Sequence, residues 1–273
     1  MMIKVRALVL TALLLPCIAP SAASARVLIP FQRVDDGLIQ VRASLDGNAP
    51  VPMLVDIGAG IDILGAKTAD SLRSARTGRY TSWRMEGERL DVPTGSIASI
   101  GLGAFRVENP TIATWNGLDG SGIDGLISAT AFRETPVTFD FPDNELVVED
   151  AASLAVRKKT AVRVPLALQD DRGISLGVFA RFDFGNGQSG LCEIDTGSQG
   201  FVLDKHYAVA LGVDRVGGAI PSLTLHGAPA TTIAKPPVVF SDLIFDCNVG
   251  NDFWANKQFS LDIPDRALFV PRQ

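Results

Sequence analysis

The chain has 273 residues, of which 47% are apolar and 20% charged, so its composition is that of a globular protein with a sizeable core, not a disordered or fibrous one. Its 25 Lys and Arg residues against 30 Asp and Glu residues give a net charge of −5, and no basic stripe is present. We therefore expect no nucleic-acid partner. The 26 Gly and 16 Pro residues, scattered among short apolar runs, favour a turn-rich β protein.

The first 25 residues differ from the rest of the chain. Lys4 and Arg6 precede an apolar stretch from Ala7 to Leu15, and small residues follow up to Ala25. This order predicts a secretory signal peptide over residues 1–25 and an exported protein, periplasmic or secreted. The alternative is an uncleaved anchor helix, but the apolar stretch is shorter than the roughly 20 residues that span a bilayer. No later segment is long and apolar enough to span one, so we expect no stable membrane insertion after signal removal.

The remainder of the chain repeats itself, which predicts an internal duplication. Three pairs of segments recur in the same order, at offsets of 135, 139 and 122 residues: 27–31 with 162–166, 53–59 with 192–198, and 139–148 with 261–270. We therefore expect an N-terminal lobe over 26–150, a linker over 151–160 and a C-terminal lobe over 161–273.

Each half consists of short runs of Val, Ile, Leu and Phe separated by Gly, Asp, Asn and Pro, which is typical of strands and hairpins. Turn signals lie at matching points, first at 46–48 and 184–187, then at 142–144 and 264–266. Helical pattern is limited to 66–72 and 205–211. The sequence thus predicts an all-β chain in two lobes with little helix.

One residue type stands out in the second repeated pair: Asp56 and Asp195 each end an apolar strand and are followed two residues later by Gly58 or Gly197. A carboxylate directly after an apolar run is unusual because burying a lone charge is costly. The simpler alternative for one such motif is an Asp that merely opens a turn. Two copies at matching places in a repeated chain favour a shared functional role.

The segments Val55-Asp56-Ile57-Gly58-Ala59 and Ile194-Asp195-Thr196-Gly197-Ser198 resemble the two active-site loops of the aspartic peptidases, both pepsin-like and retropepsin-like. The segments 123–127 and 248–250 resemble the strands that pass beside those loops in the family. The resemblance extends over most of the chain after residue 25. It implies a duplicated acid-protease fold, with two β-rich lobes and an active-site cleft between them.

The resemblance also implies an exported aspartic endopeptidase in which Asp56 and Asp195 share one proton and activate a water molecule. Its substrate would be a peptide or unfolded protein, and it would act as a monomer without a cofactor. The loops would be supported by Gly58, Ala59, Thr196, Gly197 and Ser198, with Ser198 hydrogen-bonding the carboxylate of its own lobe.

The first loop departs from the family at Ile57, where a Thr or Ser would hydrogen-bond across the lobe interface. A backbone group left without that partner would cost about 1–3 kcal/mol. A catalytically silent module that binds extended peptide segments in the same cleft is therefore the alternative to an active peptidase.

Three further expectations concern the surroundings of the cleft. A flap could be formed by the segment 79–90, with Tyr80 or Trp83 as its aromatic residue, although both rings could equally be ordinary packing residues. Cys192 and Cys247 could form a disulfide or remain two thiols. If the strands that carry them are neighbours, as in the family, a bridge would brace the second loop.

Other catalytic classes lack their signatures. The sequence has two His residues, His206 and His226, and neither lies in a metal-binding motif. It has no G-x-S-x-G elbow, no P-loop and no dinucleotide fingerprint. We therefore expect no metal site.

Overall fold

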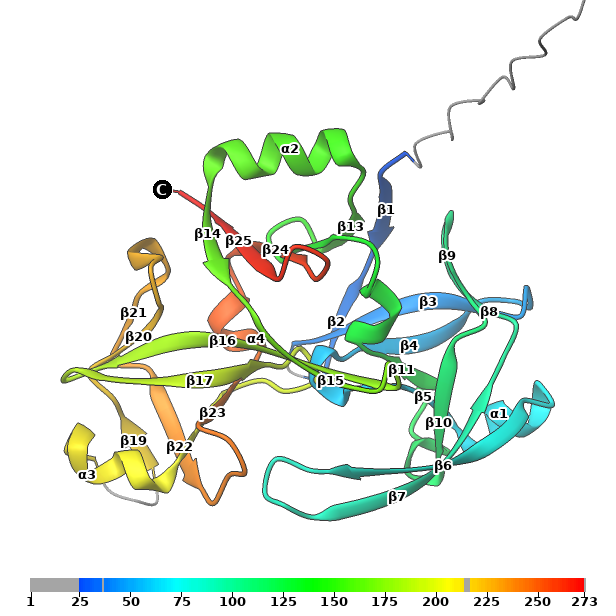
Figure 1. Cartoon of the computed structure of the whole chain (residues 1–273), viewed down its shortest axis with the longest axis horizontal. Coiled ribbons are helices and arrows are strands. Elements are labelled where there is room, and N and C mark those ends of the chain that lie inside the picture. The colour runs from blue at the N-terminus through cyan, green and yellow to red at the C-terminus, as the bar shows by residue number, and fades with distance from the viewer. Residues whose placement is uncertain (1–24, 36, 214–216, 273) are drawn as a thin grey trace, which may run out of the picture.

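The structure is a computed structural model that describes residues 25–35, 37–213 and 217–272, so residues 1–24 of the predicted signal peptide lie outside the described residues. Figure 1 shows two lobes rich in β-strands, with a third group of strands and helix α2 (Ala151–Thr160) above them. The prediction of a mostly β, two-lobed chain is confirmed. No helix among the described residues is long and apolar enough to cross a membrane.

The first lobe is a ten-stranded sheet in which β6, β7, β10, β5, β11, β4, β3, β8 and β9 lie in that order, with β2 beside β3. Its strands are β2 (Gln32–Val34), β3 (Leu38–Leu45), β4 (Val51–Val55), β5 (Asp62–Gly65), β6 (Ala75–Trp83), β7 (Arg89–Ser96), β8 (Ser99–Leu102), β9 (Phe105–Glu108), β10 (Thr111–Trp115) and β11 (Gly125–Ile127). Its short helices are η1 (Ile57–Ala59), α1 (Ala66–Ser71), η2 (Asn116–Leu118) and η3 (Ala129–Phe132).

The second lobe is a nine-stranded sheet with the order β19, β22, β18, β23, β17, β16, β20 and β21, and β15 beside β16. Its strands are β15 (Ala167–Asp171), β16 (Ser175–Gly185), β17 (Gln188–Ile194), β18 (Phe201–Asp204), β19 (Gly217–Ala219), β20 (Ser222–Leu225), β21 (Ile233–Ala234), β22 (Pro237–Ser241) and β23 (Cys247–Val249). Its helices are η4 (Lys205–Tyr207), α3 (Ala208–Leu211), η5 (Pro229–Thr231) and α4 (Asn251–Trp254).

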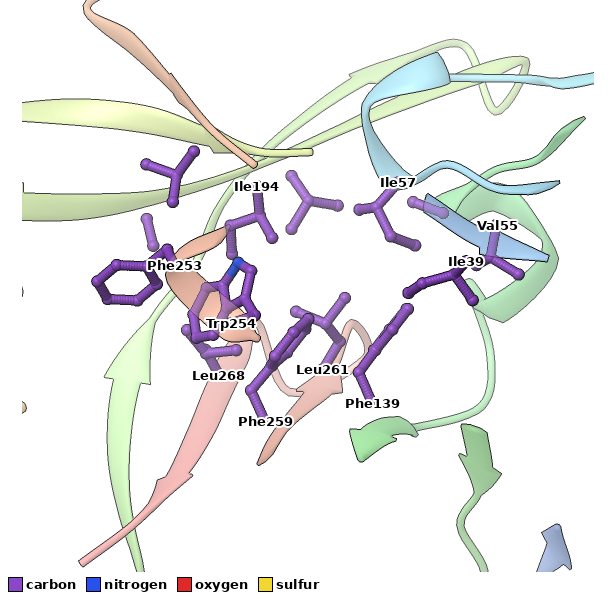
Figure 2. Packing of buried hydrophobic residues seen from close by; sticks show 14 of the residues in the cluster. Ile39, Val55, Ile57, Phe139, Ile194, Phe253, Trp254, Phe259, Leu261 and Leu268 are labelled. Carbon is purple, nitrogen blue, oxygen red and sulfur yellow. The ribbon is translucent and has the colours of Figure 1, made fainter. Parts of the chain in front are cut away.

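A six-stranded sheet joins the lobes, in the order β1 (Val27–Pro30), β13 (Glu145–Val148), β12 (Val137–Asp140), β24 (Gln258–Asp262), β25 (Ala267–Pro271) and β14 (Ala161–Pro165). The central pair, β12 and β24, comes from the two different halves of the chain. Phe139 lies opposite Phe259 in this pair, and their rings stack with centroids 4.7 Å apart. Figure 2 shows these two rings side by side below the loops that carry Ile57 and Ile194. The shared sheet therefore packs against the junction of the two lobes.

The predicted turns and helices occur at the expected places. Asp46 and Asn186 have φ values of 53° and 50° at the tips of the β3–β4 and β16–β17 hairpins, which suits Asp and Asn because they tolerate the left-handed region. The other turn pair is alike in both lobes, since Asp140 accepts from the Asp143 N–H and Asp262 from the Asp265 N–H, each at 3.2 Å. The expected linker is helix α2, a conformation that the sequence analysis did not predict.

Candidate active site

The same arrangement of strands presents each candidate aspartate. In the first lobe β4 runs parallel to β11, and in the second β17 runs parallel to β23. Asp56 and Asp195 each follow the last residue of the first strand in the pair. Their N–H groups donate to the carbonyl groups of Ile127 and Val249, at 2.8 and 3.1 Å. Strands β4 and β17 therefore end at corresponding points of the two lobes, and the carboxyl groups of Asp56 and Asp195 lie at the junction.

The two loops meet so closely that each glycine faces the carboxyl group of the other lobe. A Cβ atom added at Gly58 would lie 2.5 Å from Oδ1 of Asp195, and one at Gly197 would overlap the Asp56 carboxyl carbon. Any side chain at either position would displace a carboxyl group. The structure thus brings the carboxyl groups of Asp56 and Asp195 together at the lobe junction.

A hydrogen-bond pair from one lobe to the other supports the first loop. Thr196 Oγ1 accepts from the N–H of Ile57 at 3.0 Å and donates to the carbonyl oxygen of Val55 at 2.7 Å. Thr196 is fully buried there. Ile57 has no hydroxyl with which to make the reciprocal pair, and its side chain lies in the apolar core (Figure 2). Of these two residues, only Thr196 therefore makes side-chain hydrogen bonds to the loop of the other lobe.

Asp195 has donors on both of its carboxylate oxygens. The Gly197 N–H donates to Oδ1 at 2.8 Å, and the Asn248 side-chain amide donates to Oδ2 at 2.7 Å. The expected direct bond from Ser198 to this carboxylate is wrong: the Ser198 hydroxyl donates to Oδ1 of Asn248 at 2.8 Å. Asn248 stands between the hydroxyl and the carboxylate and turns its amide toward Asp195.

Asp56 has poorer surroundings. Its Oδ1 is buried without a hydrogen-bond partner in the described part of the chain. Ala59, which occupies the place of Ser198, has no hydroxyl to donate. Burial, followed by the charge of Asp195 and the hydrogen bond with it, holds the pKa of Asp56 well above its usual range. The shared proton is therefore favoured on Asp56.

Each lobe also supports the loop of the other through a hairpin. From the second lobe, the N–H of Leu176 donates to the carbonyl oxygen of Gly60 at 2.7 Å. From the opposite side, Gln199 donates to the Asp35 carbonyl oxygen at 2.6 Å, and Asn251 to that of Gly37 at 3.1 Å. Both hairpins carry Asp-rich turns in the sequence, at 35–37 and 170–173, but the sequence analysis did not predict this exchange.

The predicted flap segment forms the β6–β7 hairpin, which Figure 1 shows reaching from the first lobe toward the second. Its tip contacts the loop after β22: the Ile244 N–H donates to the Met85 carbonyl oxygen at 2.9 Å, and the Ser241 hydroxyl donates to the Glu86 carboxylate at 2.5 Å. Tyr80 is nearly buried, whereas Trp83 is 56% exposed. The hairpin therefore spans the two lobes.

A groove of about 410 Å³ lies beneath this hairpin. Gly58–Gly60 of the first loop, Tyr80 and Trp83 of the hairpin, and Glu193 line it, together with Phe179 and Phe245 from the second lobe. The Asp56 and Asp195 side chains are not among its lining residues and adjoin it through Gly58 and Glu193. The groove therefore lies beside the carboxyl pair.

A disulfide joins Cys192 to Cys247 and links the parallel strands β17 and β23 directly before the second loop. The next pair in the same register is Glu193 with Asn248. The sequence analysis quoted both residues within motifs but assigned a role to neither. A signal was present, because Glu193 interrupts an apolar strand where the first lobe has Leu54.

The comparisons with known proteins agree with this geometry. Residues 41–131, which include the first loop and strand β11, match the family described as Aspartyl protease. Over this part of its length the chain is similar to the aspartic peptidase family. No curated protein matches it.

Solved structures with the same fold resemble the chain over almost its full length. Basic 7S globulin from soybean has a TM-score of 0.59 at 12% identity, covering 90% of this chain and 95% of its own. Conglutin gamma, a basic 7S globulin from lupine seeds, has a TM-score of 0.58 at 10% identity, with coverage of 91% and 95%. Aspartic proteinase from Irpex lacteus has a TM-score of 0.57 at 15% identity, with coverage of 91% and 98%. At these identities the similarity shows the fold alone.

Proposed function

We propose that this protein is an aspartic endopeptidase that hydrolyses peptide bonds with a water molecule activated between Asp56 and Asp195. The observation that carries the proposal is the pairing of the two carboxyl groups across the lobe junction, with Asp56 holding a proton at pH values where an ordinary Asp is ionised. Two carboxyl groups that share one proton supply both an acid and a base at a single point.

The steps follow from the unequal surroundings of the pair. The Asp195 carboxylate, oriented by Gly197 and Asn248, takes a proton from the water as its oxygen attacks the scissile carbonyl carbon. Asp56 donates its proton to the carbonyl oxygen, so that the intermediate carries no net oxyanion charge. The intermediate then collapses: the proton on Asp195 passes to the leaving nitrogen as the C–N bond breaks. One hydroxyl of the intermediate returns a proton to Asp56, which restores the starting pair. The two titrations belong to the pair as a whole.

The substrate that suits the groove is an extended peptide or an unfolded protein segment, since both lobes and the β6–β7 hairpin line the space. Movement of the hairpin tip away from Ser241 and Ile244 would admit the chain. We further propose that the protein acts as a monomer after export to the periplasm or the exterior, which agrees with its disulfide.

A second function keeps the same groove without chemistry: binding of an extended peptide by a catalytically silent module. Two observations favour it. Thr196 bonds the first loop with no hydroxyl at Ile57 to return the bond, and two of the structures with this fold are basic 7S globulins.

The test uses the purified chain from residue 26 onward with a denatured protein as substrate, between pH 3 and pH 7. Cleavage is expected, and Asp56→Asn and Asp195→Asn should each lower it by about 10³-fold or more, since each removes one partner of the proton exchange. Because the pKa of Asp56 is raised, the loss of activity on the alkaline side should come well above pH 4.

The matched control is Asp183→Asn, an exposed carboxylate paired with His226 at 3.0 Å, which should leave the rate unchanged. Cleavage that survives in Asp195→Asn would refute the carboxyl-pair mechanism. Absence of cleavage at every pH, with retained binding of the same substrate, would establish the silent module instead.

A further inference from the structure

A third carboxyl group, that of Glu193, points toward the groove beside the catalytic pair. Side chains alternate along a strand, so Glu193 and Asp195 share one face of β17 while Cys192 and Ile194 share the other. Cys192 and Ile194 are fully buried, and Figure 2 shows Ile194 in the apolar core. Glu193 therefore faces away from that core, and it lines the groove.

The neighbours of Glu193 are an aromatic ring on one side and an amide on the other. Across β16, Phe179 lies directly opposite Glu193, and across β23, Asn248 does. The ring of Phe179 meets that of Phe245 edge to face, with centroids 5.6 Å apart. The amide of Asn248 is already used by Asp195. Glu193 thus lies between an aromatic ring and an amide whose side-chain bond goes to Asp195.

No hydrogen bond or ion pair reaches the Glu193 side chain from any other residue that the structure describes. The other groove carboxylates have partners: Asp170 pairs with Arg133, and Asp171 pairs with Arg172. Burial, and then the charges of Asp195 and Asp56, raise the pKa of Glu193 well above its usual value. A carboxyl group kept there without a partner is costly for folding, so its place beside the carboxyl pair requires another explanation.

We propose that Glu193 is a specificity-determining residue that binds the cationic side chain of a Lys or Arg residue adjoining the scissile bond. The inference rests on the endopeptidase function proposed above. Residues two apart on a strand are separated by about 6.6 Å, which is about two residues of an extended substrate. A side chain that contacts Glu193 therefore belongs to a substrate residue at or next to the bond that Asp195 acts on.

A long cationic side chain fits both parts of this subsite. Its methylene stem packs on Phe179 and Phe245, while its charged end reaches the Glu193 carboxylate and ionises it by proximity. A metal ion is the other cation that could be expected among three carboxyl groups. However, the described residues contain no group of three or more His, Cys, Asp or Glu side chains placed to hold one.

The experiment compares two peptides that differ at a single residue beside the cleavage point, one with Lys and one with norleucine, which keeps the stem but lacks the ammonium group. We expect the protein to cleave the Lys peptide with a kcat/KM about tenfold or more above that of the norleucine peptide. In Glu193→Gln this preference should fall to within about twofold. Glu193→Leu, which copies Leu54 of the first lobe, should prefer norleucine. Asp171→Asn, a paired carboxylate of the same groove, should retain the Lys preference.

Equal cleavage of both peptides by the unaltered protein, or a Lys preference that persists in a folded Glu193→Gln protein, overturns the subsite. If neither peptide is cleaved, the endopeptidase function fails, and the subsite is then tested by fluorescence anisotropy with the same labelled peptides. Tighter binding of the Lys peptide that disappears in Glu193→Gln supports the subsite on its own, and equal binding refutes it. Thermal unfolding of each variant checks that it is folded.

Discussion

At the scale of single residues, the junction of the two loops is asymmetric in its hydrogen bonds. Thr196 serves the first loop, where it binds the backbone of Ile57 and Val55. Ile57 fills the corresponding place in the core and returns no bond. Its apolar contacts stabilise the junction, while the backbone of the second loop is left without a hydroxyl partner from the first lobe. At residue 57 the junction therefore has apolar packing in place of the two hydrogen bonds that a hydroxyl side chain would make.

Comparison of Ile57→Thr with Ile57→Val isolates the missing hydroxyl, since Thr and Val have nearly the same shape. Both variants lose apolar contact, which costs about 0.5–1.5 kcal/mol in Ile→Val. If the hydroxyl reaches the backbone at Ile194 and Thr196, the Thr variant should be more stable than the Val variant by about 1–2 kcal/mol. Urea unfolding measures this difference. A Val variant more stable than the Thr variant would mean that the hydroxyl is buried without a partner.

At the scale of elements, β5 carries a buried carboxyl group that takes no part in the proposed chemistry. Asp62 is 1% exposed and accepts bonds from the N–H of Ser128 at 2.7 Å and from its hydroxyl at 3.1 Å. Burial outweighs these bonds and raises the pKa of Asp62 to about 6. The folded protein therefore binds this proton more tightly than the unfolded chain does.

This shift predicts a loss of stability with rising pH. Below pH 4 the residue is protonated in both states and has no effect; between about pH 4 and pH 6 the unfolded chain releases its proton first, so stability falls as pH rises. The shift corresponds to about 3 kcal/mol at pH 7. Asp62→Asn keeps an acceptor for Ser128 without the charge. It should equal the unaltered protein near pH 3.5 and exceed its stability by up to about 3 kcal/mol at pH 7.

Urea unfolding at pH 3.5, 5 and 7 checks this prediction. Asp252→Asn, which removes an exposed carboxylate from helix α4, is the control and should show no such pH dependence. A constant difference between Asp62→Asn and the unaltered protein over the three pH values would contradict the shift.

Helix α2 has a capping residue at its start and basic residues at its end, and both are visible in the sequence. Asp150 accepts from the N–H of Ser153 at 2.7 Å, Ser153 returns a bond to the Asp150 N–H, and Arg157 lies in the last turn. An acidic cap at the start and basic residues at the end are signals of a helix. The sequence analysis predicts only a linker over 151–160, because this segment lacks the alternation of a strand.

At the scale of the whole molecule, the two lobes are joined by a sheet to which both contribute. Strands β12 and β24 pair at its centre, so that Phe139 lies opposite Phe259 and Val137 opposite Leu261. All four of these residues are completely buried. Their burial depends on the presence of both halves, and the connection through α2 keeps the halves in one chain.

We therefore expect that neither half folds alone. Expressed separately, residues 26–155 and 156–273 would each expose an unpaired edge of the central sheet and the ring of Phe139 or Phe259, which favours aggregation. Circular dichroism during heating should show no cooperative transition for either fragment, in contrast to the intact chain. A cooperative transition in either fragment would show that its lobe is independent of the shared sheet.

The sequence by itself determined what depends on residues close together in the chain. Alternating apolar runs and turn residues predicted the strands and hairpins, and the recurrence of Asp56 and Asp195 pointed to one family and one pair of carboxyl groups. Positive-φ turns such as Asp46 and Asn186 were readable because their geometry is local.

The tertiary structure alone decided what depends on partners far apart. It placed Gly58 against Asp195, gave the Ser198 hydroxyl to Asn248 rather than to a carboxylate, and left Glu193 in the groove without a partner. Hydrogen bonds and charges act over a few ångströms in space. Which groups come that close depends on how the strands pair and the lobes meet, and a single sequence does not show those distances.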